Sequence, residues 1–211
     1  MSDRTDRFGC QSAAPVLGSV EGKRVAMVVF SHYPFDNRPR RAAEALVGLG
    51  MTVDMICLRE DSDPKREVVN AVNVRRVPIN RRRGGILGYI FQYVAFLLLS
   101  AAVIAKRSLK RRYDLVLAAD TLVYLGDLSR AFTAAWSRLR AGGQFLFTVE
   151  AKDGEAFELG PKRRYRHSES YLREEAATCG FDVMGLIACS PRSEANRPVE
   201  GFAAALQKSA E

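Results

Sequence analysis

The run Tyr113-Asp114-Leu115-Val116-Leu117-Ala118-Ala119-Asp120 decides which fold this sequence predicts. Its central residues are apolar and the run is short, which is typical of a strand buried on both faces of a parallel sheet. Asp120 is the next polar residue, so we expect the strand to end there. A similar run at residues 24–30, RVAMVVF, predicts a second strand of the same kind.

Strands and helices alternate on both sides of these runs. Strands are predicted over residues 24–30, 52–58, 72–77, 114–119 and 144–149, and residues 181–188 and 201–206 are expected to form a closing antiparallel pair. Apolar residues at helical spacing predict helices over residues 40–49, 128–139 and 169–179. Gly50 and Gly180 are expected to stop the first and last helices, and Ser168 to cap the last one. Such alternation favours a parallel sheet with crossover helices.

The fold class is therefore α/β, a single doubly wound Rossmann-like three-layer sandwich. Residues 1–22 are polar and of mixed charge, and we expect them to be a disordered leader. The domain is expected to span residues 23–207, with residues 208–211 as a tail.

The net charge points to an anionic partner. The chain of 211 residues has 32 Lys and Arg against 24 Asp and Glu, a formal charge of +8. Part of the excess lies in Arg81-Arg82-Arg83 and in residues 106–112. Clustered basic residues suit phosphates or an acidic membrane surface, and they can also be a solvated face. We expect no nucleic-acid partner.

The uncharged run from Gly84 to Ala105 has three interpretations. It is almost long enough to span a bilayer. It could instead lie in the membrane interface, bound to anionic lipid through the flanking basic residues. It could also be a crossover helix packed on the sheet. Positive charge on both sides gives no inside–outside asymmetry, which disfavours the spanning helix.

Histidine and cysteine are too sparse to predict a metal site. The chain has two histidines, His32 and His167, and four cysteines without CxxC spacing. Cys57 lies in an apolar run and is expected to be a buried small hydrophobe. This usage fits a reducing cytoplasm. The predicted location is cytoplasmic, with peripheral attachment to the inner face of the cell membrane as an option.

Residues 23–116 resemble the amino-terminal domain of family-4 retaining glycosyltransferases. The resemblance rests on residues 25–46, VAMVVFSHYPFDNRPRRAAEAL, on Gly50 to Asp54, on Val74 to Pro78 and on the apolar helix before Tyr113. It implies a domain that binds the acceptor, often a lipid-linked one at a membrane. It would place Ser31, His32, Asp36, Arg38 and Arg40 around the acceptor and the donor phosphates. His32 could equally be a loop histidine with local hydrogen bonds.

Residues 113–207 resemble the carboxyl-terminal half of a class I S-adenosylmethionine-dependent methyltransferase, of the type found with tetratricopeptide repeats. The resemblance rests on residues 114–128, DLVLAADTLVYLGDL, on residues 139–145, LRAGGQF, and on residues 165–168, 171–172 and 177–183. It implies that Asp120 faces a crevice for S-adenosylmethionine and substrate, with Tyr124, Tyr165 and His167 on the substrate side. Asp120 could instead be a helix N-cap.

The resemblance also assigns an acid after the second strand to the cofactor ribose. Glu60 or Asp61 could serve, and either could be a surface residue. The first turn of the methyltransferase fold is glycine-rich, whereas Ser31 to Asp36 contains no glycine. We therefore expect S-adenosylmethionine binding to be weak or absent.

Together the two resemblances describe a recombinant Rossmann-type domain with strand order 3-2-1-4-5-7-6. Three functions remain open. The chain could be a methyltransferase-like domain with weak or lost cofactor binding, or the acceptor-binding half of a membrane-associated family-4 glycosyltransferase. It could also be a non-catalytic binding module. The substrate would be a small molecule or a lipid-linked one.

Overall fold

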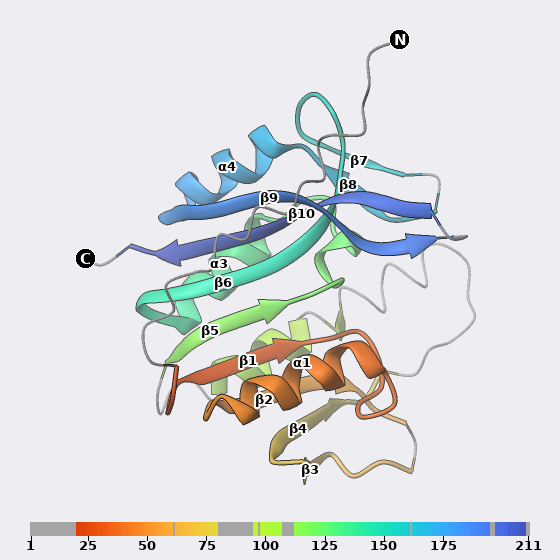
Figure 1. Ribbon diagram of the computed structural model, residues 1–211, viewed down its shortest axis with the longest axis vertical. Coiled ribbons are helices and arrows are strands. Elements are labelled where there is room, and N and C mark those ends of the chain that lie inside the picture. Colours follow the sequence, from red (N-terminus) through yellow and green to blue (C-terminus); the bar gives the residue numbers. More distant parts are fainter. Residues whose placement is uncertain are drawn as a thin grey trace.

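The computed structural model describes residues 20–60, 62–79, 95–96, 98–106, 112–160, 162–194 and 197–209. Within these residues, ten strands form one sheet (Figure 1). The strands are β1 (Arg24–Val28), β2 (Thr52–Leu58), β3 (Arg66–Val69), β4 (Val72–Val77), β5 (Tyr113–Ala118), β6 (Leu139–Ala151), β7 (Phe157–Leu159), β8 (Tyr165–His167), β9 (Phe181–Glu194) and β10 (Arg197–Lys208).

The strand order is β3-β4-β2-β1-β5-β6-β10-β9, which confirms the predicted order with β3 added at one edge. β1 pairs in parallel with β2 on one side and with β5 on the other. Val25 lies opposite Leu115 in the second of these pairings. The two halves of the sequence therefore share one sheet, and the order of the strands reverses between β1 and β5.

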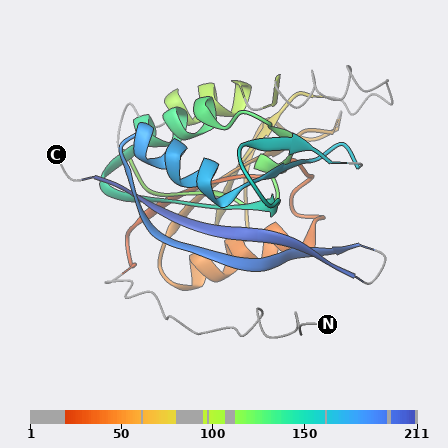
Figure 2. The same cartoon turned by 90° about the horizontal axis from the view of Figure 1, so that it is seen from above.

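Helices cover both faces of the sheet (Figure 2). Helix α1 (Asn37–Gly48) lies on one face, and α3 (Ser129–Arg138), α4 (Glu169–Thr178) and helical residues 98–106 lie on the other. Alternate residues of β1 point to opposite faces, as the period of a strand requires. Val25 and Met27 join the core under α1, whereas Ala26 and Val28 join the core under the other helices.

Several elements differ from the prediction in their length. Helix α1 begins at Asn37 rather than Arg40, because the Asp36 carboxylate accepts a hydrogen bond from the Arg38 backbone and caps the helix. β6 begins at Leu139, and its pairing with β5 is shifted in register between Leu139 and Gln144, around Gly142 at φ 68°. Strands β3, β7 and β8 were not predicted, because they have only three or four residues each and no apolar run.

Only part of the Gly84 to Ala105 run is described, and that part packs on the sheet. Phe96 makes an edge-to-face contact with Phe30, with ring centroids 5.1 Å apart. Ser100 and Ile104, one and two turns further on, are also buried, whereas Leu98 and Leu99 are exposed. None of the described helices is long and apolar enough to cross a membrane. Residues 80–94, which include the Arg81–Arg83 cluster, lie outside the described residues, so lipid binding stays a prediction.

The structure describes part of the predicted leader, part of the predicted tail, and Cys57. Residues 1–19 of the predicted leader lie outside the described residues, while Val20 packs against the core under α1. Lys208 is the last residue of β10 rather than part of a tail, and its ammonium donates to the carbonyls of Trp136 and Leu139. Cys57 is fully buried, as predicted, and burial raises the pKa of its thiol to about 11.

Candidate functional site

The candidate site is the edge of the sheet at the carboxyl ends of β1, β2 and β5, the place where open parallel sheets have their ligand crevice. In open parallel sheets, ligands bind where the strand order reverses, outside the carboxyl ends of the strands. Here that point lies between β1 and β5. Ser31 and His32 follow β1, Glu60 follows β2, and Asp120 follows β5. The structure therefore brings these predicted residues to one edge of the sheet.

The loop after β1 is held by hydrogen bonds between its own residues. The Asp36 backbone donates a hydrogen bond of 3.0 Å to the His32 carbonyl, and the Tyr33 side chain between them is buried. The Asp36 carboxylate accepts from the Arg38 backbone at 3.1 Å. Pro34 and Pro39 have no N–H to offer. The chain's own carboxylate therefore occupies the helix N-terminus, where an incoming anion would otherwise bind.

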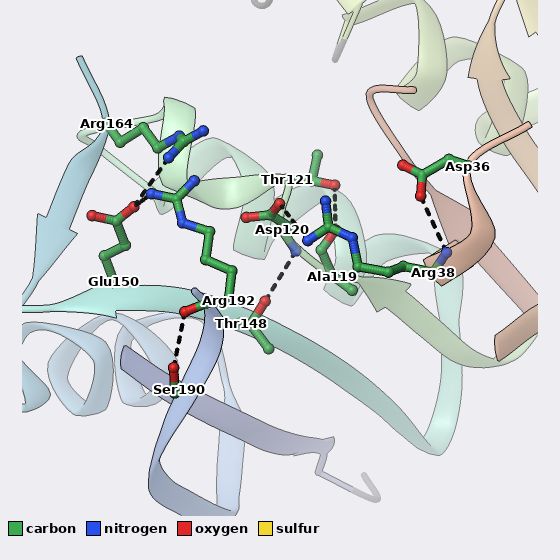
Figure 3. Close-up of polar contacts among 10 residues, drawn as sticks. All are labelled: Asp36, Arg38, Ala119, Asp120, Thr121, Thr148, Glu150, Arg164, Ser190 and Arg192. Carbon is green, nitrogen blue, oxygen red and sulfur yellow. Dashed lines mark hydrogen bonds and ion pairs between the residues drawn. The ribbon is translucent and has the colours of Figure 1, made fainter. Parts of the chain in front are cut away.

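An ion pair crosses from α1 to the end of β5. The Arg38 guanidinium lies 3.7 Å from the Asp120 carboxylate, and both are drawn in Figure 3. Asp120 has φ 51°, and its backbone N–H donates 3.0 Å to the Thr148 hydroxyl at the end of β6. The following residue, Thr121, donates from its hydroxyl to the Val28 carbonyl at 3.0 Å and takes the N-cap position of the 3-10 helix η2 (Leu122–Tyr124). These hydrogen bonds fix the backbone at Asp120 and Thr121 at the end of β5.

The remaining crevice residues from the first half divide into two groups. His32 Nδ1 lies 3.7 Å from Glu60; the His32 side chain is partly buried, whereas Glu60 is exposed. Arg40 lies on α1, where its charge acts on the buried Tyr33 hydroxyl. The structure therefore brings His32, Glu60 and Asp120 to the crevice and places Arg40 on α1.

Two of the three ring-bearing residues predicted from the second half, Tyr165 and His167, pack against the same Phe157 ring. Tyr124 lies between the Phe30 ring, at 6.3 Å, and the Arg164 guanidinium, at 5.7 Å. Tyr165 stacks edge-on against Phe157 instead, at 6.0 Å. His167 is fully buried, with its Nε2 2.9 Å from the Gly126 carbonyl and its ring stacked on Tyr171 at 5.8 Å. His167 is therefore a core residue, whereas Tyr124 is only partly buried.

Sequence reasoning missed a second polar cluster beside the crevice. It consists of Glu150, near the carboxyl end of β6, and the guanidinium groups of Arg164, Arg166 and Arg192. Arg164 belongs to the basic run Lys162-Arg163-Arg164, which was a usable signal. Nothing in the sequence indicated that Arg192 belongs to this cluster, because it lies 42 residues from Glu150.

Comparison with sequence families identifies the chain. A family model described as a glycosyl transferase 4-like domain matches residues 36–195, which is well over half of the sequence. The chain belongs to the glycosyl transferase 4-like family. The match runs through both halves, past β5 at Tyr113–Ala118. Comparison with curated proteins gave no significant match.

The fold of this glycosyl transferase 4-like chain is also that of S-adenosylmethionine-dependent methyltransferases. The structure of one from Methanosarcina mazei superposes with a TM-score of 0.54 at 12% identity, covering 90% of this chain and 94% of the other. One from Mesorhizobium loti gives 0.52 at 14% identity, covering 90% and 93%. The 1,6-didemethyltoxoflavin-N1-methyltransferase of Burkholderia thailandensis, with bound S-adenosylhomocysteine, gives 0.51 at 14%, covering 90% and 72%. At these identities the likeness shows the fold alone.

The loop of this glycosyl transferase 4-like chain does not fit the methionine end of that cofactor. Close approach of a ligand to the backbone needs glycines and free N–H donors. Here Pro34 lacks an N–H, and the Arg38 N–H is bonded to Asp36. Among the described residues, no three His, Cys, Asp or Glu side chains lie close enough together to hold a metal ion.

Because the imidazole of His167 is buried, we expect the stability of the folded chain to depend on pH. Burial lowers the pKa of His167 to about 4, against 6.5 for the free side chain. Below about pH 6.5 the His167 imidazole therefore binds a proton in the unfolded chain but not in the folded chain. The free energy of unfolding falls as the pH drops from about 6.5 to about 4. The loss amounts to about 3 kcal/mol, at 1.36 kcal/mol per pKa unit.

Urea denaturation between pH 7.5 and pH 4.5 measures this loss. In His167→Gln the slope of the unfolding free energy against pH should become shallower over this interval, although the variant is less stable at pH 7.5. Equal slopes in the two proteins would show that His167 does not carry the effect.

Proposed function

We propose that this chain is an acceptor-binding domain of transferase type, and that its acceptor joins a sugar-like head to an apolar chain. The observation that carries the proposal is an apolar cavity of about 300 Å³ beside the crevice. Thr121, which follows Asp120 in the sequence, lines this cavity. A ligand could therefore have a polar head near Asp120 and an apolar part in the cavity.

The crevice residues suit a sugar head. The Asp120 and Glu60 carboxylates can accept hydrogen bonds from hydroxyl groups, and the Arg38 guanidinium can donate them. Arg38 is mostly exposed and its nitrogen is 3.7 Å from Asp120, so a ligand hydroxyl can insert between the two side chains at little cost. This chemistry agrees with the acceptor role that the family resemblance implies.

The cavity suits an apolar chain. It lies between helical residues 98–104 and α3, over the sheet, and is lined by Ile104, Val116, Leu122 and Ala131 among others. Apolar cavities of this size bind apolar groups rather than water. Lipid-linked acceptors combine such a chain with a sugar, which is why we prefer them to free sugars.

A methyltransferase is the second candidate, favoured by the fold and by Asp120 at the end of β5. We rank it lower because of the loop from Ser31 to Asp36. Pro34 has no backbone N–H, the Asp36 N–H is bonded to the His32 carbonyl, and the loop has no glycine, so the methionine part of S-adenosylmethionine would lose contacts. Each 1.4 kcal/mol lost weakens binding about tenfold.

Isothermal titration with two ligands tests the proposal. Octyl glucoside below its micellar concentration should bind at least about 50-fold more tightly than glucose, because burying three methylenes contributes about 2.4 kcal/mol. S-adenosylmethionine should show no binding at micromolar concentrations. Micromolar S-adenosylmethionine binding that is lost in Asp120→Ala would favour the methyltransferase instead.

A pair of variants on α3 locates the apolar part. Ala131→Phe should fill the cavity and reduce the preference for octyl glucoside over glucose to a few-fold. Thr133→Phe adds the same ring on the exposed side of the helix and should leave that preference unchanged. If the two variants behave alike, the cavity does not hold the alkyl chain.

A further inference from the structure

Arg76 is a buried arginine near the carboxyl end of β4, one residue before the strand ends. We propose that Arg76 is a positioning residue of the candidate site. Its guanidinium holds the loop after β1, which carries His32, and the loop after β2, which carries Glu60. The inference deepens the proposed function because it concerns the same site, and it rests on that function only where a ligand is measured.

The Arg76 side chain is only 3% exposed, and its guanidinium contacts two loops and a strand. Nη2 donates to the Tyr33 carbonyl at 3.1 Å, and Nη1 donates to the Pro64 carbonyl at 3.3 Å. Nε lies 3.4 Å from Asp63 Oδ2, and Nη2 also bonds to the Glu67 carboxylate in β3. A guanidinium can make these contacts together because its planar fork presents donors in several fixed directions.

The contact with Tyr33 reaches across a neighbouring strand. β2 lies between β4 and β1 in the sheet (Figure 1), so the Arg76 side chain has to span the width of β2 to reach the loop after β1. Tyr33 is next to His32 in the sequence, and its own side chain is buried. Fixing the Tyr33 carbonyl therefore limits where the His32 side chain can lie.

The contact with Asp63 holds the loop of Glu60. Asp63 Oδ2, the atom that faces Arg76, also accepts a hydrogen bond of 3.1 Å from the Glu60 backbone N–H. The Asp63 backbone N–H in turn donates to the Glu60 carbonyl at 3.0 Å. Asp63 thus bonds to both backbone groups of Glu60, and the place of Glu60 depends on the side chain that holds Asp63.

An arginine that only stabilised the margin of the sheet would contact mainly β3. Of the acceptors named above, Glu67 lies in β3, whereas the others, Tyr33, Asp63 and Pro64, lie in the two loops. Burying a charged group is costly and needs partners with good geometry, and here the loops supply most of them. The two loops are therefore held in place before a ligand arrives, which lowers the cost of ordering them on binding.

Cys57 is a probe of the loop after β1 that needs no ligand. It lies opposite Arg76 in the pairing of β2 with β4, and it is fully buried in the same core as Tyr33. Burial raises the pKa of its thiol, an effect that the Tyr33 backbone and the Arg76 charge partly offset. A thiol reagent can reach Cys57 only when this part of the chain opens.

Labelling of Cys57 with DTNB, in a chain whose other cysteines are replaced by serine, tests the proposal. Arg76→Lys keeps the charge but not the fork, and it should accelerate labelling at least about tenfold because hydrogen bonds of a charged group are lost. The acceleration should exceed the change in the global unfolding constant, measured with urea. Arg66→Lys makes the same change at an exposed side chain of β3 and should leave the rate unchanged.

Asp63→Asn keeps the test open if Arg76→Lys does not fold. The Asp63 side chain is 21% exposed, so this change is milder. It removes the charge that faces Arg76 Nε, which loosens the guanidinium, and it should accelerate the labelling of Cys57 by about threefold.

The ligand measurements use titration calorimetry with glucose and octyl glucoside. Arg76→Lys and Asp63→Asn should each weaken the binding of both ligands by about tenfold, because the loops then have to be ordered on binding. The preference for octyl glucoside over glucose should stay unchanged. It depends on the apolar cavity, which lies on the face of the sheet opposite to the core of Tyr33 and Cys57.

A labelling rate in Arg76→Lys equal to that of the unaltered chain would overturn the proposal. An acceleration no larger than the loss of global stability explains would also overturn it, because Arg76 would then be a purely structural residue. Unchanged glucose affinity in a variant with faster labelling would contradict the positioning role. If neither sugar binds the unaltered chain, the proposed function fails, whereas the labelling rates still decide whether Arg76 holds the loop after β1.

Discussion

The variant Asp54→Asn is expected to lower the free energy of unfolding by about 3 kcal/mol, because it removes the charge from one side of a buried ion pair. Asp54 in β2 is fully buried. Its carboxylate lies 3.0 Å from the Arg24 guanidinium in β1 and accepts from the Tyr113 hydroxyl in β5 at 2.9 Å. The side chain thus joins three parallel strands, and Asp54→Asn removes the carboxylate that pairs with the Arg24 guanidinium, which is only 15% exposed.

Urea unfolding followed by circular dichroism measures this effect. The matched control is Glu169→Gln, the same chemical change in an exposed pair with Arg173 at 2.7 Å, which should cost at most about 0.5 kcal/mol. The double variant Arg24→Met with Asp54→Leu should be more stable than Asp54→Asn, because it replaces both charges of the pair with apolar groups. A loss below about 1 kcal/mol for Asp54→Asn would show that the network does not depend on this charge.

The variant Phe132→Ala should cost about 3–5 kcal/mol, the usual range for truncating a buried phenylalanine. Phe132 is fully buried on α3. Its ring centroid lies 5.6 Å from that of Phe145, 5.4 Å from Phe147 and 6.2 Å from Phe181. The ring therefore joins the helix to β6 and β9, and its loss leaves a cavity that the rigid sheet cannot close.

Phe35→Ala provides the comparison for Phe132→Ala, since Phe35 is 75% exposed and its truncation should change stability by less than about 0.5 kcal/mol. Phe132→Leu should fall between the two variants. Thermal unfolding gives the same ranking as urea if α3 unfolds together with the sheet. Equal stability of Phe132→Ala and Phe35→Ala would mean that the aromatic cluster does not hold α3 to the sheet.

The central strands could be predicted because a strand that is buried on both faces consists almost entirely of apolar residues. β2 and β4 have the predicted bounds, and the start of β6 differs because a glycine-containing irregularity extends it. The strand order, however, came from family resemblance, since apolar runs do not say which strands are neighbours. Strands β3, β7 and β8 lie at the margins of the sheet, where alternation and apolarity are weak.

The candidate site was predictable only in part. The crevice beside Asp120 follows from the rule that parallel strands end at one edge, and the structure places His32, Glu60 and Asp120 there. The interior position of His167 was not predictable, because a histidine in a polar stretch gives no sign of the Gly126 carbonyl that receives it.

By itself, the sequence determined that this chain forms an α/β sheet with its polar residues at the ends of apolar strands. Only the tertiary structure decided which of those polar residues meet. Arg192 reaches Glu150 because β9 and β10 fold back beside β6, and Arg24 reaches Asp54 because β1 and β2 pair in one register. The physical reason is that hydrophobic periodicity records the local burial of each residue, whereas an ion pair depends on the register between strands that are distant in the chain.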